Sequence, residues 1–202
     1  MLSGEILYLE TGVNKQEDSH LHCDNDDICK KEKTMTDSQT NPRVAAIRQR
    51  LATAYQSLNE LLDGPLARLE AEGLYRAPQE EEWTVTENLA HIVEFMPYWG
   101  GEIEKLVARP GANFGRTKQH EGRLRAISEH GHDTLSEIRA QLPTSYAHLD
   151  TILSHLTDQD PDITGQHSTF GERSLDWFIE EFVTRHLEDH VKQIREALQR
   201  IQ

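Results

Sequence analysis

Residues 174–201 read SLDWFIEEFVTRHLEDHVKQIREALQRI, and this segment decides the fold class. Its apolar side chains recur every three or four positions, which is the period of an amphipathic α-helix. A ladder at steps of four carries two histidines where the pattern would otherwise continue with apolar residues. The ladder consists of Phe178, Phe182, His186, His190 and Ile194. The segment therefore predicts a core-facing helix with two imidazole rings on one face, about 5.4 Å apart along the helix axis.

Two segments nearer the start of the chain show the same helical period. Residues 42–63 begin with a proline, which suits a first helical turn, and they stop before a Gly-Pro pair. Residues 85–107 form the second long helix. Thr84 and Glu87 stand immediately before and just inside it, at the spacing of a capping box. Both segments are therefore expected to be buried along one stripe.

A third helical region, residues 124–156, is less regular. Pro143 lies inside it and is expected to kink or divide the helix, because proline donates no backbone hydrogen bond. Polar loops at 111–122 and 157–172 flank the region, and no alternating strand pattern competes with the helices. Four main amphipathic helices predict an all-α four-helix bundle over residues 41–202.

The composition excludes several classes of function. The 202 residues hold 21 Lys and Arg against 35 Asp and Glu, so the formal net charge is -14. Nucleic-acid binding is not expected, because it depends on clustered positive charge. No apolar run approaches the length of about 20 residues that spans a bilayer, and the first residues lack the basic start of a secretory signal. We therefore expect a cytoplasmic protein without a membrane partner.

Residues 1–40 differ from the rest of the chain. They hold nine acids against four lysines and show no sustained apolar period, so we predict a disordered acidic extension. His20, His22, Cys23 and Cys29 lie in it as possible metal ligands, but their spacing matches no usual zinc motif. A solvated tail is the interpretation that the composition favours.

His91, on the second long helix, supplies a third imidazole to the pair on the last helix. Three nitrogens from two helices resemble a catalytic zinc site, which keeps one position for water or substrate. The alternative is that the three histidines are core residues satisfied by carboxylates, because a buried polar group without a partner costs about 1–3 kcal/mol. Glu87, Glu94 and Asp189 are the nearby carboxylates. The residue pattern by itself leaves both interpretations open.

Two stretches resemble the DinB-like (DinB/YfiT-type) family of metalloproteins. WTVTENLAHIVEF (83–95) is similar to that family's W-[ST]-x-x-E-x-L-x-H segment, and FVTRHLEDHVKQI (182–194) is similar to its last helix. The loop HSTFGERSL (167–175) also resembles the loop that precedes that helix. The resemblance covers about residues 42–201. It implies an up-down-down-up four-helix bundle in which His91, His186 and His190 bind one divalent metal ion.

The resemblance also bears on cofactor and function. Zinc or nickel is expected first, although imidazole suits iron and copper as well. Relatives include thiol-dependent transferases and isomerases, which implies a metal-dependent hydrolase or transferase that acts on a small molecule, with a low-molecular-weight thiol as a second partner. The alternative is a metal-binding or stress-response bundle without turnover, so enzymatic activity is left undecided. A homodimer is compatible with a bundle, although no stripe of residues demands one.

Other residues receive more limited expectations. Glu94 would act as a base if it faced the metal, and Trp99, Tyr98 and Phe182 would wall a pocket. Arg116 is expected at the surface, with contact to an anionic substrate as the alternative. Solvated side chains are expected for the histidines outside the triad, and one of them would line the mouth of the site if it were not solvated. These are His120, His130, His132, His148, His155 and, at the mouth, His167.

Overall fold

The computed structural model describes residues 42–201. Seven α-helical elements, two 3-10 turns, a π-helical turn and two short strands make up this part of the chain. In order they are α1 (Pro42–Asp63), η1 (Leu66–Arg68), α2 (Ala71–Leu74), α3 (Val85–Ala108), α4 (Glu121–His130), α5 (Leu135–Ser154), η2 (Asp160–Asp162), β1 (Thr164–His167), β2 (Gly171–Ser174), α6 (Leu175–Ile179), the π turn η3 (Glu180–Thr184) and α7 (Arg185–Ile201).

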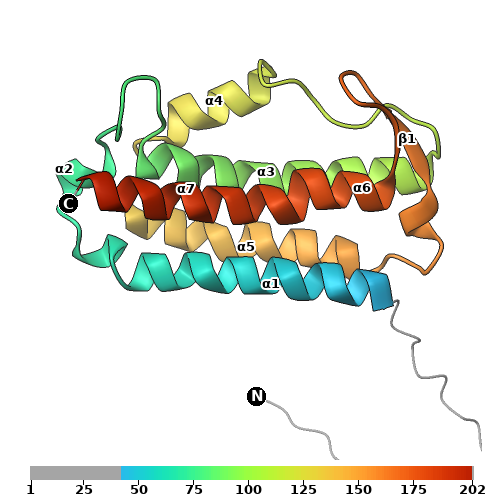
Figure 1. Cartoon of the computed structure of the whole chain (residues 1–202), viewed down its shortest axis with the longest axis horizontal. Helices are drawn as coiled ribbons and strands as arrows, with labels where there is room; N and C mark the ends of the chain where they lie inside the picture. The colour runs from blue at the N-terminus through green and yellow to red at the C-terminus, as the bar shows by residue number, and fades with distance from the viewer. Residues whose placement is uncertain (1–41, 202) are drawn as a thin grey trace, which may run out of the picture. The chain divides into compact units, whose positions relative to one another are not determined.

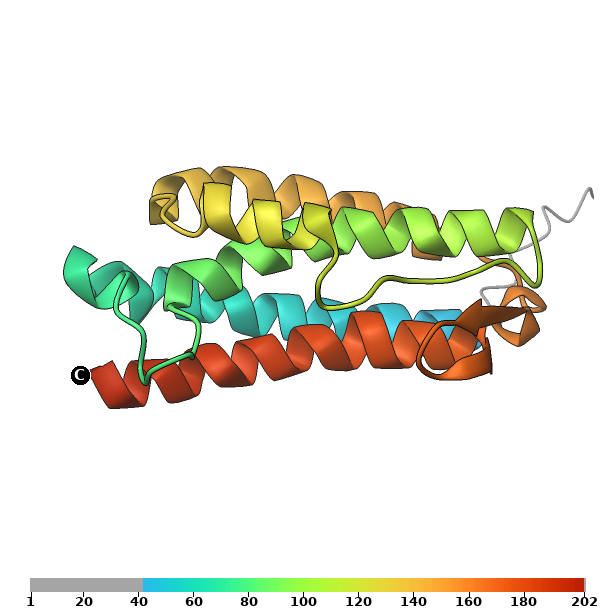
Figure 2. The same cartoon turned by 90° about the horizontal axis from the view of Figure 1, so that it is seen from above.

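Four long helical segments lie side by side as a bundle (Figure 1). They are α1, α3, α5 and the continuous segment formed by α6, η3 and α7. The first and last run in one direction while α3 and α5 run in the other (Figures 1 and 2). Helix α3 packs against α5 and α7, and α1 packs against the same two helices. The all-α bundle is thus confirmed, and its helices have the up-down-down-up order.

The starts of the helices follow from local hydrogen bonding. Thr84 accepts a hydrogen bond from the backbone of Glu87, whose side chain accepts one from the backbone of Thr84, so the predicted capping box starts α3. Ser174 caps α6 through its side chain in a similar way, and Pro42 occupies the first turn of α1. These caps fix where each helix begins and hence which side chains turn inward.

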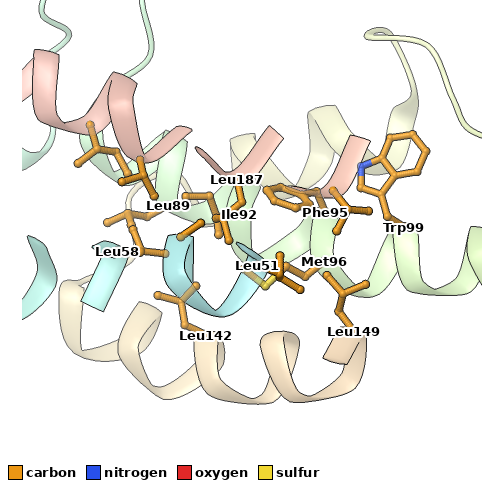
Figure 3. Packing of buried hydrophobic residues seen from close by; sticks show 14 of the residues in the cluster. Leu51, Leu58, Leu89, Ile92, Phe95, Met96, Trp99, Leu142, Leu149 and Leu187 are labelled. Atoms are coloured by element: carbon orange, nitrogen blue, oxygen red, sulfur yellow. The ribbon is translucent and has the colours of Figure 1, made fainter. Parts of the chain in front are cut away.

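The core lies between the four segments (Figure 3). Each of these four segments contributes leucines or other apolar side chains with essentially no exposed surface, and each such side chain contributes about 1.5–3 kcal/mol through burial. The labelled members are Leu51, Leu58, Leu89, Ile92, Phe95, Met96, Trp99, Leu142, Leu149 and Leu187. In residues 42–201 no helix is both long enough and apolar enough to cross a bilayer.

The third helical region departs from its prediction. Pro143 lies inside α5, which continues through it from Leu135 to Ser154 without a break. The division falls earlier, where Gly131 ends α4 and Thr134 caps α5 with a second capping box. The separate helix α4 packs against α3 (Figure 1), and the long connection after α3 runs back along the bundle to reach it (Figure 2).

A β-hairpin also replaces part of a predicted loop. Strands β1 and β2 pair antiparallel, with Thr164 opposite Ser174 and His167 opposite Gly171. Residues 111–114 add backbone hydrogen bonds to β1, so the segment after α3 is held against the hairpin. Four-residue strands leave too little sequence for an alternating pattern to be recognised. The hairpin places His167 next to the final helix.

Candidate metal centre

Three imidazole rings from two helices converge inside the bundle. His91 belongs to α3, while His186 and His190 lie one turn apart on α7. The Nε2 atom of His186 is 3.1 Å from Nε2 of His91 and 3.3 Å from Nε2 of His190. One ligand atom from each ring lies within 4.8 Å of the others. In a tetrahedral site with metal–nitrogen bonds of about 2.0–2.1 Å, two nitrogens are about 3.3 Å apart. The spacing therefore suits a single ion.

The rings are buried and electrically neutral. His91 and His190 are 3% and 6% exposed, and His186 is partly buried. Burial lowers the pKa of all three, to about 3 for His186 and about 2 for His190, and the mutual repulsion of the rings adds to the effect for these two. At neutral pH the rings are therefore uncharged and have lone pairs available for a cation.

Asn88 fixes the orientation of His190, and the sequence interpretation missed this residue. Its Nδ2 donates to the backbone oxygen of Thr84 at 2.9 Å, which leaves Oδ1 facing Nδ1 of His190 at 3.0 Å. The Nδ1 of His190 must then carry the proton, so its Nε2 presents a lone pair to the other rings. Thr84, which caps α3, thus positions Asn88 through its backbone oxygen, and Asn88 in turn sets the tautomer of His190 on α7.

Glu94 lies behind His91 instead of facing the triad. Its Oε2 is 3.5 Å from Nδ1 of His91, which is long for a hydrogen bond, and this buried nitrogen has no closer partner. Arg116 donates two hydrogen bonds, of 2.5 and 2.6 Å, to the same carboxylate. Burial alone would raise the pKa of Glu94, but His91 and Arg116 outweigh it and lower the pKa to about 2. The prediction of a general base is therefore not supported by the position of Glu94.

One further expectation about a charged residue was wrong, and one alternative is excluded. Arg116 is not a surface residue, because its side chain is 4% exposed and its guanidinium lies 3.7 Å from the centre of the Tyr98 ring. Glu87 is not a partner of His91, since its carboxylate belongs to the capping box at Thr84. Sequence spacing placed Glu87 and Glu94 on the helix face of His91 but could not distinguish their partners.

The π turn η3 directly precedes the two histidines of the last helix. Arg185 donates its backbone N–H to Glu180, five residues earlier, and the buried hydroxyl of Thr184 donates to the carbonyl oxygen of Ile179. Side chains at steps of four drift by about 40° in a regular α-helix. The wider π turn counters this drift, so Phe178 before it and His190 after it both face the interior.

A cavity of about 550 Å³ adjoins the triad. His91 and His186 lie at one side of it, and Trp99 and Phe182 form the predicted aromatic wall, with their rings stacked 4.6 Å apart. His167 also lines this cavity, as expected for a residue at the mouth, and is 6% exposed instead of solvated. The Tyr98 ring packs against the Arg116 guanidinium instead of lining the cavity. The triad therefore has a route to solvent.

The other candidate histidines stay outside this centre. Those at 120, 130, 132, 148 and 155 have exposed side chains, as predicted, and His120 caps α4. Only His91, His186 and His190 form a group that could hold an ion among the residues that the structure describes. The predicted extension, with His20, His22, Cys23 and Cys29, lies outside the described residues.

Comparison with known protein families identifies a match for most of the chain. The family model described as DinB superfamily matches residues 50–194. This range includes all three histidines of the triad and most of the four-helix bundle. No curated protein matches the chain.

Proposed function

Because the chain belongs to the DinB superfamily, we propose that it binds one divalent metal ion through His91, His186 and His190. Zinc or nickel is the proposed ion, since imidazole nitrogens suit both. We propose further that the ion acts on a small molecule in the adjoining cavity, as a metal-dependent hydrolase or thiol-dependent transferase. The observation that supports metal binding most directly is the convergence of three Nε2 atoms.

The hydrogen bonds around the triad do not satisfy all three converging nitrogens, whereas a cation would. The proton of His190 is on Nδ1, and the carboxylate of Glu94 favours a proton on Nδ1 of His91. Two of the three converging nitrogens then hold lone pairs, and only Nε2 of His186 could carry a proton. It could donate that proton to one neighbour at a time, which leaves one lone pair unsatisfied. A metal ion satisfies all three nitrogens at once.

The cavity favours an enzyme over a closed binding site. A purely structural zinc site usually has four protein ligands, whereas three histidines leave a position open. When bound, the ion would act as a Lewis acid that lowers the pKa of a water or thiol in that position. The aromatic wall and the burial of the rings limit the access of bulk water to this side of the triad.

Asp189 is the base to test first. It lines the cavity together with Glu181, but Glu181 is paired with Arg185 at 3.0 Å. Asp189 forms no ion pair within residues 42–201, so its carboxylate is available to accept a proton from a bound water or thiol. The Asp189→Asn variant is expected to keep the metal and lose turnover.

Metal content tests the proposal directly. Protein purified without chelators should contain about one equivalent of zinc or nickel by elemental analysis. His186→Ala should lose the metal yet keep its helical circular dichroism, whereas His155→Ala, at an exposed position, should keep both. Full occupancy in His186→Ala would show that the ligand assignment is wrong.

Turnover is a separate question from metal binding. Loaded protein should transfer a low-molecular-weight thiol to a small electrophile such as 1-chloro-2,4-dinitrobenzene, or hydrolyse an activated ester, faster than His186→Ala does. A protein that binds one equivalent of metal and accelerates neither reaction would support the non-catalytic alternative.

A further inference from the structure

Arg123 is a cation beside the triad without a carboxylate partner. It lies on α4, and its guanidinium carbon is 4.8 Å from the centre of the Trp83 ring. That ring is 5.2 Å from the His91 ring and 6.0 Å from the His190 ring, centre to centre. No carboxylate in residues 42–201 lies within ion-pair distance of Arg123. Its hydrogen bond from Nη1 to the backbone oxygen of Lys118, at 2.9 Å, leaves other N–H groups free.

The charges around the cavity are unbalanced at this point. The negative charge of Glu94 is offset by the bidentate contact with Arg116, and Glu181 pairs with Arg185. Among the residues that line the cavity, two cations, Lys118 and Arg123, then remain against the single carboxylate of Asp189. Three neutral imidazoles give no negative charge to a bound divalent cation. The cation and Arg123 would therefore create a positive region that an anion can neutralise.

Part of the lining of the same cavity is aromatic. Trp99 and Phe182 stack on each other there, and the ring of His167 is 5.1 Å from that of Phe182. Phe170, on the hairpin loop, is 39% exposed and also lines the cavity. The cavity thus offers a cationic side chain beside the triad, and aromatic side chains that contact His167 and Phe170 of the hairpin.

We propose that Arg123 anchors the carboxylate of a small amphiphilic acid, whose planar apolar part contacts the Trp99 and Phe182 rings. A guanidinium binds a carboxylate through two parallel hydrogen bonds, and the contact with Trp83 holds Arg123 in place for this role. The proposal rests on the proposed function above and names its substrate class. It requires α4 to lie over the triad, which the long connection between α3 and α5 achieves.

Binding of phenylacetate tests the proposal. Titration calorimetry on zinc-loaded full-length protein should show tighter binding of phenylacetate than of the neutral analogue 2-phenylethanol. Arg123→Gln should weaken phenylacetate binding by about tenfold or more, the loss expected for a hydrogen-bonded charge. Arg125→Gln is the matched control, since it removes the same charge from α4 but lines a different cavity. It should bind phenylacetate as the unaltered protein does.

Two further measurements separate this proposal from the one on which it rests. Metal content should be unchanged in Arg123→Gln, because all three histidines remain. The same loss of phenylacetate affinity should appear in metal-free protein, so a failure of metal binding does not prevent the test. Arg123→Lys, which keeps the charge but loses the planar fork, should give an intermediate affinity and covers the case in which Arg123→Gln does not fold.

Two results would overturn the proposal. One is an unchanged affinity for phenylacetate in Arg123→Gln. The other is the absence of phenylacetate binding to unaltered protein in both the loaded and the metal-free state.

Discussion

Replacing Asn88 by alanine should weaken metal binding without removing a ligand. Asn88 is 3% exposed and holds Nδ1 of His190 at 3.0 Å, so it selects the tautomer that directs Nε2 toward the other rings. Loss of such an orienting partner typically lowers metal affinity by about 10- to 100-fold. That range corresponds to about 1.4–2.8 kcal/mol of binding free energy.

The same variant should also destabilise the metal-free protein. His190 would lose the amide acceptor at its buried Nδ1, at a cost of at most about 1–3 kcal/mol, because Gln193 is a second side-chain hydrogen-bond partner of His190. The backbone oxygen of Thr84 would lose the side-chain donor but would keep the backbone N–H of residue 88, 3.2 Å away in the unaltered protein, so it adds little to this cost. Alanine is the better helix former and returns about half a kcal/mol. We expect a net loss of about 1–2 kcal/mol.

Competition with a chelating dye measures the affinity, and urea unfolding of the metal-free protein measures the stability. Asn59→Ala, which removes an amide beside Tyr55 on α1, serves as a control and should leave metal affinity unchanged. His190→Ala should abolish tight binding and sets the lower limit. If Asn88→Ala bound zinc within about twofold of the unaltered protein, its proposed control of the His190 tautomer would be refuted.

Four other perturbations test the fold and the electrostatics of the site. The lowered pKa values of the three histidines mean that the unfolded chain binds more protons below pH about 6.5. The free energy of unfolding of metal-free protein should therefore fall between pH about 6.5 and 3, on the order of 1 kcal/mol per pH unit for each of His186 and His190, as acid-dependent urea titrations would show. The lowered pKa of His91 adds to the fall in the same direction. Thr84→Ala should lower the free energy of unfolding by about 0.5–2 kcal/mol through loss of the α3 cap. An unchanged midpoint temperature in thermal unfolding would contradict that role. Gly115→Ala should lower the free energy of unfolding by at least about 1–2 kcal/mol, because φ is +86° and the new Cβ would lie 3.0 Å from the His167 ring. Gly101→Ala, which has open space around it, should stabilise α3 by about 0.5–1 kcal/mol.

The sequence was sufficient to predict the first, second and last long helices and their buried faces, but not the division of the third region into α4 and α5. Apolar period, the Thr84–Glu87 capping box and the Gly-Pro break are local features, and local hydrogen bonding and burial act on them in the same way in any helical fold. The pair His186 and His190 could be placed on one face for the same reason. Joining His91 to that pair required the resemblance to known proteins, because residue spacing within one helix says nothing about which helix lies opposite.

The partners of each polar group depended on the tertiary structure. Glu87 and Glu94 both lie within four residues of His91 in sequence, yet one caps the helix and the other meets Arg116, which comes from a distant connection. The position of Asn88 opposite His190, and of Arg123 beside the triad, likewise depends on how α3, α4 and α7 pack. Hydrogen bonds and ion pairs act over a few ångströms, so residues far apart in the chain become partners only when the packing of the helices brings them together.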